Sequence, residues 1–583
     1  MSLGELNLCG IFGFTDSNTT SLQIMMNAVA HRGPDGRGEY LSSEISLGHT
    51  RLAILDISKR GKQPMFSPDQ NVVCIFNGEI YNFKELRSMY LNEYRFHSNS
   101  DAEVIPYLYE KFGIDFIQKL RGVFAIAIYD KRSKLLYLIR DRFGVKPLYY
   151  TFQKNTCFFS SELKSFTKLS QVPTEIDFER YIEYLGFQFV PGDNTIFKNI
   201  YRVSPGSYLE VNHEGHRAVQ YYTLPAPSSV TCEKQTAFLE ENIKENLLES
   251  LSYRLISDVP IGVLLSGGLD SSSLVSLLSL IGEKNIKTFS LGFGIQSDEL
   301  EYARIVADKF KTQHTEILIQ ADDIKKNLPK IVWSLDEPLA DTGAFASWLM
   351  FKHIRQNTDI KVALVGEGAD EIFAGYSWHY ILQRLSWFPE SIKNRILFYL
   401  TTYSNSKFRN TLFKTTFLSA FNKFSDSDYL NRVLRMEFVN NLPNNLLMKI
   451  DKASMAFGIE AREVYLDHKL VESVFLFPGA VKVNPSPKNI LKKIMTPHLP
   501  KKIIQRKKQG FIMPVNHWIH NDLKKDVQGR LLSSNSFLAQ LFTHKQIENL
   551  FKPGLSFMRT SKNALLWRAY LFEIYQQEVT SSR

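Results

Sequence analysis

Residues 9 to about 220 alternate short apolar runs with polar turn signals. The clearest runs are NVVCIFNGEIY (71–81), GVFAIAIYD (122–130) and KLLYLIRD (134–141). Alternation of this kind is typical of half-buried strands, and residues 130–133 (DKRS) join the last two runs as a predicted hairpin. The pattern therefore predicts a β-rich half, with two packed sheets and a few helices.

The second half follows a different pattern. The segments IGVLLSGGLDSSSLVSLLSLIG (261–282), IKTFSLGF (286–293) and IKVALVGEGADEIFAGY (360–376) each place a short apolar run before a glycine-containing loop. The first and third then continue with helical spacing. This order predicts an α/β domain built on a parallel sheet. From about residue 380 the apolar period is mostly helical, so a helical C-terminal region is expected.

Length, composition and charge narrow the class of protein. A chain of 583 residues is too long for one hydrophobic core, and the stretch LPAPSS (224–229) has the composition of a linker. The four cysteines are scattered, without the spacing of a zinc site or a disulfide framework. No signal peptide or long apolar segment is evident, so a cytoplasmic protein is expected. The net charge of +10 comes from dispersed basic residues, which argues against nucleic-acid binding, and the lack of a long apolar segment argues against a membrane span.

The sharpest chemical motif is the loop SGGLDSS, residues 266–272. It follows an apolar strand and opens a helix, so its backbone amides can face an anion at the positive end of the helix dipole. Asp270 would repel a phosphate unless a cation lay between them, which implies Mg²⁺. The alternative is a tight turn with a capping Asp or Ser. The Gly-Lys-Ser/Thr ending of a Walker loop is absent.

A second acidic cluster follows another predicted strand. Glu367, Asp370 and Glu371 lie just after the run at 362–365, where ligands of open α/β sheets bind. Their alternative role is a solvated, capped helix start. Because both loops end strands of one predicted sheet, Asp270 and Asp370 are a candidate magnesium pair. The first loop resembles the pyrophosphate loop of enzymes that cleave ATP between its α and β phosphates.

Ordered motifs in both halves carry a wider resemblance. They are CGIFGF (9–14), HRGPDG (31–36), FNGEIYN (76–82), RDRFGVKPLYY (140–150), LLSGGLDSSS (264–273), GEGADEIFAGY (366–376) and GIEAREVYLDHKL (458–470). Together they make the chain closely similar to glutamine-hydrolysing asparagine synthetases. The resemblance implies an α+β glutaminase domain at 9–220, with an N-terminal-nucleophile β-sandwich flanked by helices. A linker at 221–235 and an α/β synthetase domain at 236–583 would follow.

The resemblance assigns roles in glutamine hydrolysis to residues of the first half. Cys9 matches the nucleophile, whose own α-amino group is the general base. Asn77 and the amide of Gly78 match the oxyanion hole. Arg51 matches the group that grips the glutamine α-carboxylate, and Glu79 and Asp101 match acceptors for its α-amine. Each charged residue alone is more often a surface charge; the ordered set favours a site.

It also implies an ATP site in the second half. Glu367 matches a glutamate important for forming an acyl-adenylate, and Lys508 matches a lysine that lines the same site, with a solvated basic loop as its alternative. Asp270 and Asp370 would hold Mg²⁺. The residues matched to ATP binding are Leu264, Ser266, Gly267, Gly268, Asp270, Ser271, Ser272, Leu291, Val365 and Gly366.

Two departures from the family pattern concern the acceptor. Val365 replaces a usual serine, and the usual Arg-Val-Pro-Phe-Leu-Asp becomes REVYLD at 462–467. The expected reaction joins glutamine, ATP and a carboxylate, with aspartate as the leading acceptor. The alternatives are another carboxylate such as a sugar acid, or a ligase that uses an internal amine, as β-lactam synthetases do. The oligomeric state stays open, with a homodimer among the options.

The position of Cys9 raises a further question, because the expected mechanism needs it as residue one. Residues 1–8 (MSLGELNL) are interpreted as a leader that is removed or as a misassigned start. The alternative is a silent glutaminase. Retention of Arg51, Asn77, Gly78, Glu79 and Asp101 favours the first interpretation.

Overall fold

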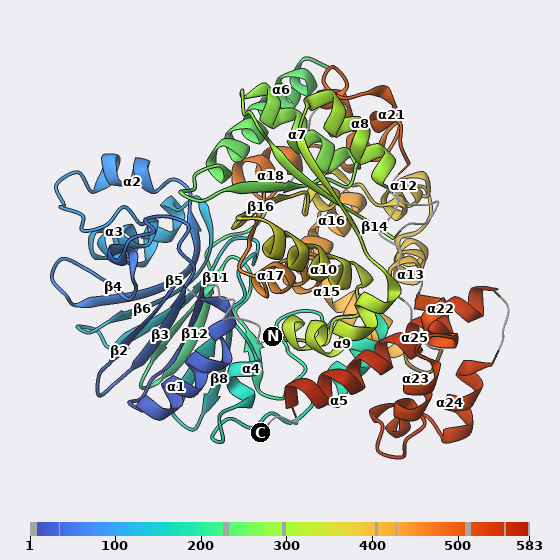
Figure 1. The fold of residues 1–583 in the computed structure, drawn as a ribbon, viewed down its shortest axis with the longest axis horizontal. Coiled ribbons are helices and arrows are strands. Elements are labelled where there is room, and N and C mark those ends of the chain that lie inside the picture. The colour runs from blue at the N-terminus through green and yellow to red at the C-terminus, as the bar shows by residue number, and fades with distance from the viewer. Residues whose placement is uncertain are drawn as a thin grey trace.

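The computed structural model describes residues 9–33, 35–225, 233–293, 299–402, 406–426, 428–507, 515–552 and 556–580. Residues 1–8, part of the predicted linker and Lys508 lie outside these ranges. The predictions made for them, and the predicted domain boundaries, therefore stay predictions. Figure 1 shows the two halves side by side, with the C-terminal helices as a third group.

The first half contains two six-stranded antiparallel sheets, which confirms the predicted β-sandwich. Apolar side chains of both sheets meet between them, among them Ile11, Ile75 and Leu138. The hairpin predicted around residues 130–133 joins the strands β6 (Gly122–Asp130) and β7 (Leu135–Arg140). In spatial order the first sheet is β10 (Ile200–Arg202), β8 (Tyr149–Gln153), β9 (Thr156–Ser160), β1 (Gly10–Phe14), β3 (Ser46–Arg51) and β2 (Gly36–Leu41). The second is β12 (Gly215–Gln220), β11 (Ser207–Asn212), β7 (Leu135–Arg140), β6 (Gly122–Asp130), β5 (Val72–Ile80) and β4 (Met65–Phe66).

The second half is built on a five-stranded parallel sheet, as predicted. Its order is β15 (Gln313–Leu318), β14 (Lys287–Gly292), β13 (Ile261–Leu264), β16 (Val362–Val365) and β17 (Glu460–Glu463). The chain runs from β13 to β14 on one side and reaches β16 on the other side. The loops after β13 and β16 therefore open into one crevice, the usual ligand site of such sheets.

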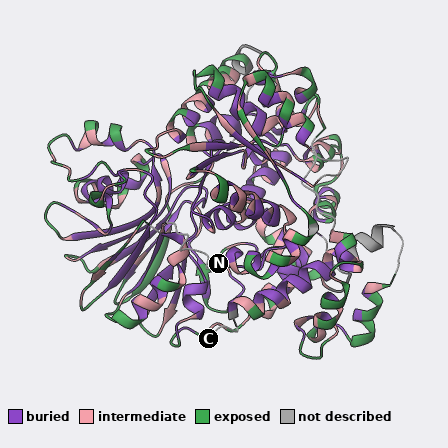
Figure 2. Ribbon diagram, viewed as in Figure 1, coloured by how far each residue is buried: buried purple, intermediate pink, exposed green. Residues whose placement is uncertain are grey.

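Helices cover both faces of this sheet, and the side chains of β16 alternate between them. Leu364 packs into the cluster that includes α7 (Leu269–Leu280) and α18 (His468–Phe475), whereas Ala363 and Val365 pack with α10 (Thr342–Asn357) and α17 (Leu447–Met455). Figure 2 shows the buried residues concentrated on the sheets and on the inner faces of the helices. The short apolar runs of the sequence are thus strands buried on both faces.

The region after residue 380 is mainly helical, with one difference from the prediction. Residues 460–463 form the edge strand β17 although three of the four are charged. All four residues are buried: Arg462 forms ion pairs with Glu79 and Glu460, and burial raises the pKa of Glu463 to about 8. A strand of this kind carries no apolar run that a sequence pattern could detect. No helix in the described ranges is long and apolar enough to span a membrane.

The C-terminal helices return to the first half. Helix α25 (Ser556–Tyr575) packs on α5 (Phe178–Phe187), where Arg568 donates hydrogen bonds to the carbonyls of Leu185 and Gly186 at 2.7 and 2.8 Å. The hydroxyl of Tyr184 in turn donates to the Arg568 carbonyl at 2.9 Å. The C-terminal helices are therefore held to the first half by buried hydrogen bonds.

Lys482 is a fully buried lysine in α19 (Gly479–Val483). Its Nζ donates to Asn431 Oδ1 at 2.9 Å, and burial lowers its pKa to about 7. Between pH 7 and 10 the unfolded chain binds a proton that the folded chain does not, so the free energy of unfolding rises with pH. We expect Lys482→Met to flatten this rise in urea denaturation, whereas exposed Lys501→Met keeps it. Equal slopes for Lys482→Met and the unchanged protein would contradict the prediction.

Candidate active sites

Cys9 directly precedes β1 and lies next to the end of β3. The register that pairs Gly10 with Thr50 leaves the cysteine beside Leu52, whose backbone N–H donates to Sγ at 3.1 Å. The thiol is partly buried, and burial raises its pKa to about 12. A thiol in this environment needs a nearby base to become a nucleophile.

Asn77 and Gly78 lie together near the end of β5. Asn77 is 1% exposed, and in the part of the chain that the structure describes its Nδ2 has no hydrogen-bond partner. Gly78 has φ +143°, and a Cβ there would lie 2.0 Å from the Val123 carbonyl oxygen. Only glycine fits this position. A buried amide donor left open beside such a glycine has the chemistry expected of an oxyanion hole.

Arg51 is buried at the end of β3, and its guanidinium is bonded to the loop that follows. Its nitrogens donate to the carbonyl oxygens of Ser58 at 2.7 Å and Leu55 at 3.3 Å, and also to that of Asp56. The arginine thus shapes the loop next to Cys9. Its predicted grip on the glutamine carboxylate stays a prediction.

Glu79 and Asp101 are both buried, and an arginine from the second half accompanies them. Arg462 of β17 lies 3.0 Å from Glu79 and 2.8 Å from Glu460. Burial raises the pKa of Glu79 well above its usual value, and raises that of Asp101 to about 6. A further cation, such as a substrate ammonium, would stabilise these carboxylates in their charged form. The synthetase half therefore contributes directly to the predicted glutamine site.

The loop at residues 266–272, called the phosphate loop from here on, and the loop after β16 border one cavity of about 1320 Å³. Leu264, Leu291 and most of the predicted ATP residues line it, together with Glu367 and Asp370. Gly267 has φ +68°, and a Cβ there would lie 2.5 Å from Ala303 N, so this glycine permits close packing on α8 (Leu300–Phe310). Ser272 and Val365 are fully buried. The loops predicted to bind ATP are thus brought together.

The two predicted magnesium ligands converge on one cationic group. Nζ of Lys488 lies 2.5 Å from Asp270 Oδ2 and 2.6 Å from Asp370 Oδ1. Among the described residues, no set of three or more histidine, cysteine or acidic side chains could hold a metal ion. Mg²⁺ commonly takes one or two carboxylates and completes its shell with phosphate and water. Two carboxylates around a cation position next to a phosphate loop fit that chemistry.

A second lysine stands near Glu367. Lys449 of α17 lines the cavity, with its Nζ 3.5 Å from Asp341 Oδ2. Asp341 and Glu367 hold the pKa of Lys449 above its usual value although burial opposes them. For Glu367, burial itself raises the pKa. A cation and a carboxyl group with a raised pKa can bind a carboxylate and accept a proton beside the phosphate loop.

Two family descriptions match the chain, one for each half. Residues 8–222 match the glutamine amidotransferase domain, and residues 242–577 match asparagine synthase. The chain belongs to the asparagine synthase family.

Among its relatives, asparagine synthetase [glutamine-hydrolyzing] 1 of Bacillus subtilis is 29% identical over 97% of this chain and 96% of its own length. Asparagine synthetase [glutamine-hydrolyzing] 3 of B. subtilis is 30% identical over 94% of each chain. Amidase chry2 of Gibberella zeae is 27% identical over 91% of this chain and 88% of its own length.

Membership of the asparagine synthase family makes the chain an ATP-dependent ligase of the glutamine-hydrolysing type. One departure from the family motif now has a structural explanation. The hydroxyl of Tyr465 donates to the Asp270 carbonyl at 2.9 Å, so this residue supports the phosphate loop. Glu463 is buried in the same strand region, and burial raises its pKa to about 8.

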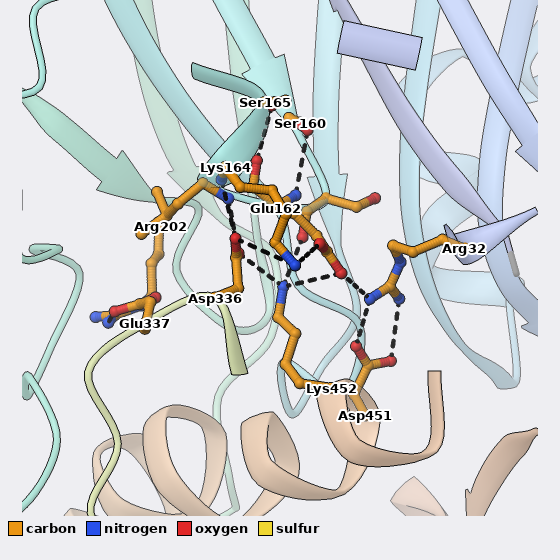
Figure 3. A network of polar contacts seen from close by, with 12 residues as sticks. Arg32, Ser160, Glu162, Lys164, Ser165, Arg202, Asp336, Glu337, Asp451 and Lys452 are labelled. Atoms are coloured by element: carbon orange, nitrogen blue, oxygen red, sulfur yellow. Dashed lines mark hydrogen bonds and ion pairs between the residues drawn. The ribbon is translucent and has the colours of Figure 1, made fainter. Parts of the chain in front are cut away.

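A buried charge network joins the two halves of this asparagine synthase family member (Figure 3). Arg32 donates to the Cys9 carbonyl at 3.0 Å and forms ion pairs with Glu162 at 2.8 Å and Asp451 at 3.0 Å. Lys452, next to Asp451 in α17, lies 3.0 Å from Asp336. Removing one member of such a network leaves an uncompensated buried charge. The network therefore fixes α17 relative to Cys9.

Sequence reasoning missed several residues that the structure brings to the sites. They are Lys449 and Lys488 in the cavity, Arg462 beside Glu79, and the network residues Arg32, Glu162, Asp336, Asp451 and Lys452. Lys488 follows a proline-rich turn and carried no local signal, whereas Arg462 lies in the motif at 458–470 without any indication that it reaches the glutamine site. Lys449 could have been found from its spacing, because it follows the polar residues Asn441 and Asn445 at intervals of four.

Proposed function

We propose that this chain transfers the amide nitrogen of glutamine to an acceptor carboxylate activated by ATP. The observation that carries the proposal is that α17 reaches both sites. Lys449 of this helix lines the phosphate-loop cavity, and Asp451 binds the arginine that holds the Cys9 carbonyl. One rigid helix thus relates a glutaminase nucleophile to a nucleotide site.

In the first step the free α-amine of Cys9 takes the thiol proton, and sulfur attacks the glutamine amide carbon. Nδ2 of Asn77 and the amide of Gly78 would stabilise the oxygen of the tetrahedral intermediate. Ammonia leaves with the proton, and water then releases glutamate from the thioester. The proposal requires Cys9 to be the first residue of the active form, since an amide nitrogen is not a base.

An apolar cluster offers ammonia a route between the sites. Cys9 packs against the cluster of Leu52, Ile54, Val362 and Met455, which joins both halves. Val362 begins β16, and Gly366 after the same strand lines the cavity. Apolar walls disfavour the ammonium ion and admit neutral ammonia.

In the second step the acceptor carboxylate attacks the α-phosphorus of ATP and pyrophosphate leaves. Asp270 and Asp370 would hold Mg²⁺, which screens the phosphate charges when it is bound. Lys449 would orient the acceptor carboxylate. Ammonia then attacks the acyl carbon, AMP leaves, and Glu367 takes the surplus proton.

The test is an acceptor panel in which AMP, pyrophosphate and amide product are measured with ATP and either glutamine or ammonium. The relatives named as asparagine synthetases make aspartate the first acceptor, and one relative is named an amidase, so the panel includes other carboxylates. We expect AMP and pyrophosphate to accompany amide formation in equal amounts. Release of ADP and phosphate would contradict the proposal.

A further inference from the structure

The cavity next to the phosphate loop is large for a nucleotide and an amino acid. Its volume is about 1320 Å³, whereas pockets for single drug-sized ligands commonly hold roughly 300–1000 Å³. Its walls beyond the nucleotide residues come from α5, α12 (Ser377–Arg384), the π-helix η5 (Leu412–Leu418) and the helical run that leads into α17. These helices can therefore contact a ligand bound beside the nucleotide. The following inference rests on the proposed function.

A polar stripe runs along one wall of this cavity. Glu437, Asn441, Asn445 and Lys449 all line it, and they recur every fourth residue. Glu437 lies in α16 (Tyr429–Val439), Asn441 directly precedes the π-helix η6 (Leu442–Leu446), Asn445 lies in η6, and Lys449 lies in α17. Side chains four apart share one helix face. The α-helical rise of about 1.5 Å per residue gives an upper limit of roughly 18 Å for the length of the stripe, which starts at Lys449 near the proposed adenylation point.

In the middle of the stripe, a buried side-chain acceptor has no hydrogen-bond partner among the described residues. Asn445 is 3% exposed and donates from Nδ2 to Asn441 Oδ1 at 3.0 Å. Its own Oδ1 has no hydrogen-bond partner within the described ranges. Buried acceptors are rarely left open unless a ligand or water completes them. Because a hydroxyl group both donates and accepts, the amide pair suits a hydroxylated ligand.

The far end of the stripe carries an aromatic surface. Trp378 stacks on Tyr376 with ring centroids 4.3 Å apart and an interplanar angle of 12°, and both residues are half-buried and line the cavity. Nε1 of Trp378 donates to Glu437 at 2.8 Å, and the second oxygen of Glu437 lies 2.7 Å from His379. These contacts fix the indole ring and occupy the carboxylate. Fixed aromatic rings bind apolar faces, such as the C–H face of a sugar ring.

Glu183 of α5 is another charged residue that lines the cavity, and its carboxylate is also paired. It accepts from Arg180 at 2.5 Å and from Thr416 at 2.7 Å. The carboxylates of Glu183 and Glu437 are thus occupied, and the side chains available to a ligand along the stripe are the amides and the aromatic rings. Lys449 lies at the end of the stripe nearest the phosphate loop. We propose that the acceptor is an elongated carboxylate on a polyhydroxylated body, such as an oligosaccharide that ends in a uronic acid. Its carboxylate lies at Lys449, its hydroxyls at Asn445 and Asn441, and a sugar ring on Trp378.

The experiment measures pyrophosphate release by the full chain with ATP, Mg²⁺ and ammonium, so that it is independent of Cys9. The acceptors are aspartate and galacturonic acid as the monomer, dimer and trimer. We expect kcat/KM to rise from monomer to trimer and to exceed the value for aspartate. Asn441→Ala and Asn445→Ala should each lower kcat/KM for the trimer about tenfold, the effect of one lost hydrogen bond. Exposed Asn422→Ala is the matched control.

Calorimetric binding of the trimer to the unchanged protein provides a second readout that needs no variant to fold. Saturable binding that weakens with the dimer supports the inference. Pyrophosphate release with aspartate but with none of the uronates would overturn it while leaving the proposed function intact. Formation of ADP with every acceptor would instead overturn the proposed function.

Discussion

Replacing Cys9 with alanine is expected to abolish glutamine-dependent synthesis while ammonia-dependent synthesis continues. The sulfur is the atom that attacks the glutamine amide, so its loss should lower glutaminase activity by roughly a thousandfold or more. Cys9 is not among the described residues that line the cavity next to the phosphate loop. Amide formation from ammonium should therefore stay within about twofold of the unchanged enzyme, as additive behaviour at separate sites requires.

The assay uses protein that begins at residue 9, with either the native cysteine or the substituted alanine there, and measures glutamate and amide product in parallel. Cys74→Ala is the matched control, because Cys74 is a fully buried core thiol in β5. It should lose some stability but keep both activities. Loss of the ammonia-dependent activity in folded Cys9→Ala would mean that the two sites do not work separately.

The sequence was sufficient for the architecture wherever apolar periodicity reports burial. The three clearest alternating runs became β5, β6 and β7 of one antiparallel sheet, and the short apolar runs before glycine loops became β13, β14 and β16. It was insufficient for β17, whose Arg462 is buried between Glu460 of the same strand and Glu79 of the first half. Burial by ion pairing leaves no hydrophobic pattern, so only the tertiary structure reveals it.

The same limit applies to the sites. The family resemblance assigned roles to Cys9, Asn77 and Gly78, whereas the loop at residues 266–272 carried a local motif, because glycines that follow a strand and open a helix are neighbours in the chain. Lys488 reaches Asp270 from 218 residues away, and Arg462 reaches Glu79 from the other domain. Long side chains that cross between elements have no fixed sequence offset. Their partners therefore could not be predicted from spacing.

Asp270→Asn and Asp370→Asn are each expected to cut synthesis on the order of a hundredfold while sparing glutamine hydrolysis. Each change removes one negative ligand from the proposed Mg²⁺ position and so weakens stabilisation of the departing pyrophosphate. Asp308→Asn is the matched control, since Asp308 is an exposed carboxylate on the neighbouring helix α8. Pyrophosphate release and glutamate release are measured on the same samples.

Lys488 separates two explanations of a loss of synthesis. Its ammonium group occupies the position between Asp270 and Asp370, and both carboxylates raise its pKa although burial opposes them. If Mg²⁺ takes this position when nucleotide binds, Lys488 must move away, and Lys488→Met should retain Mg²⁺-dependent nucleotide binding in calorimetry. Asp270→Asn and Asp370→Asn should lose the Mg²⁺ dependence of that binding. Unchanged Mg²⁺ dependence in both aspartate variants would show that the two carboxylates serve only to hold Lys488.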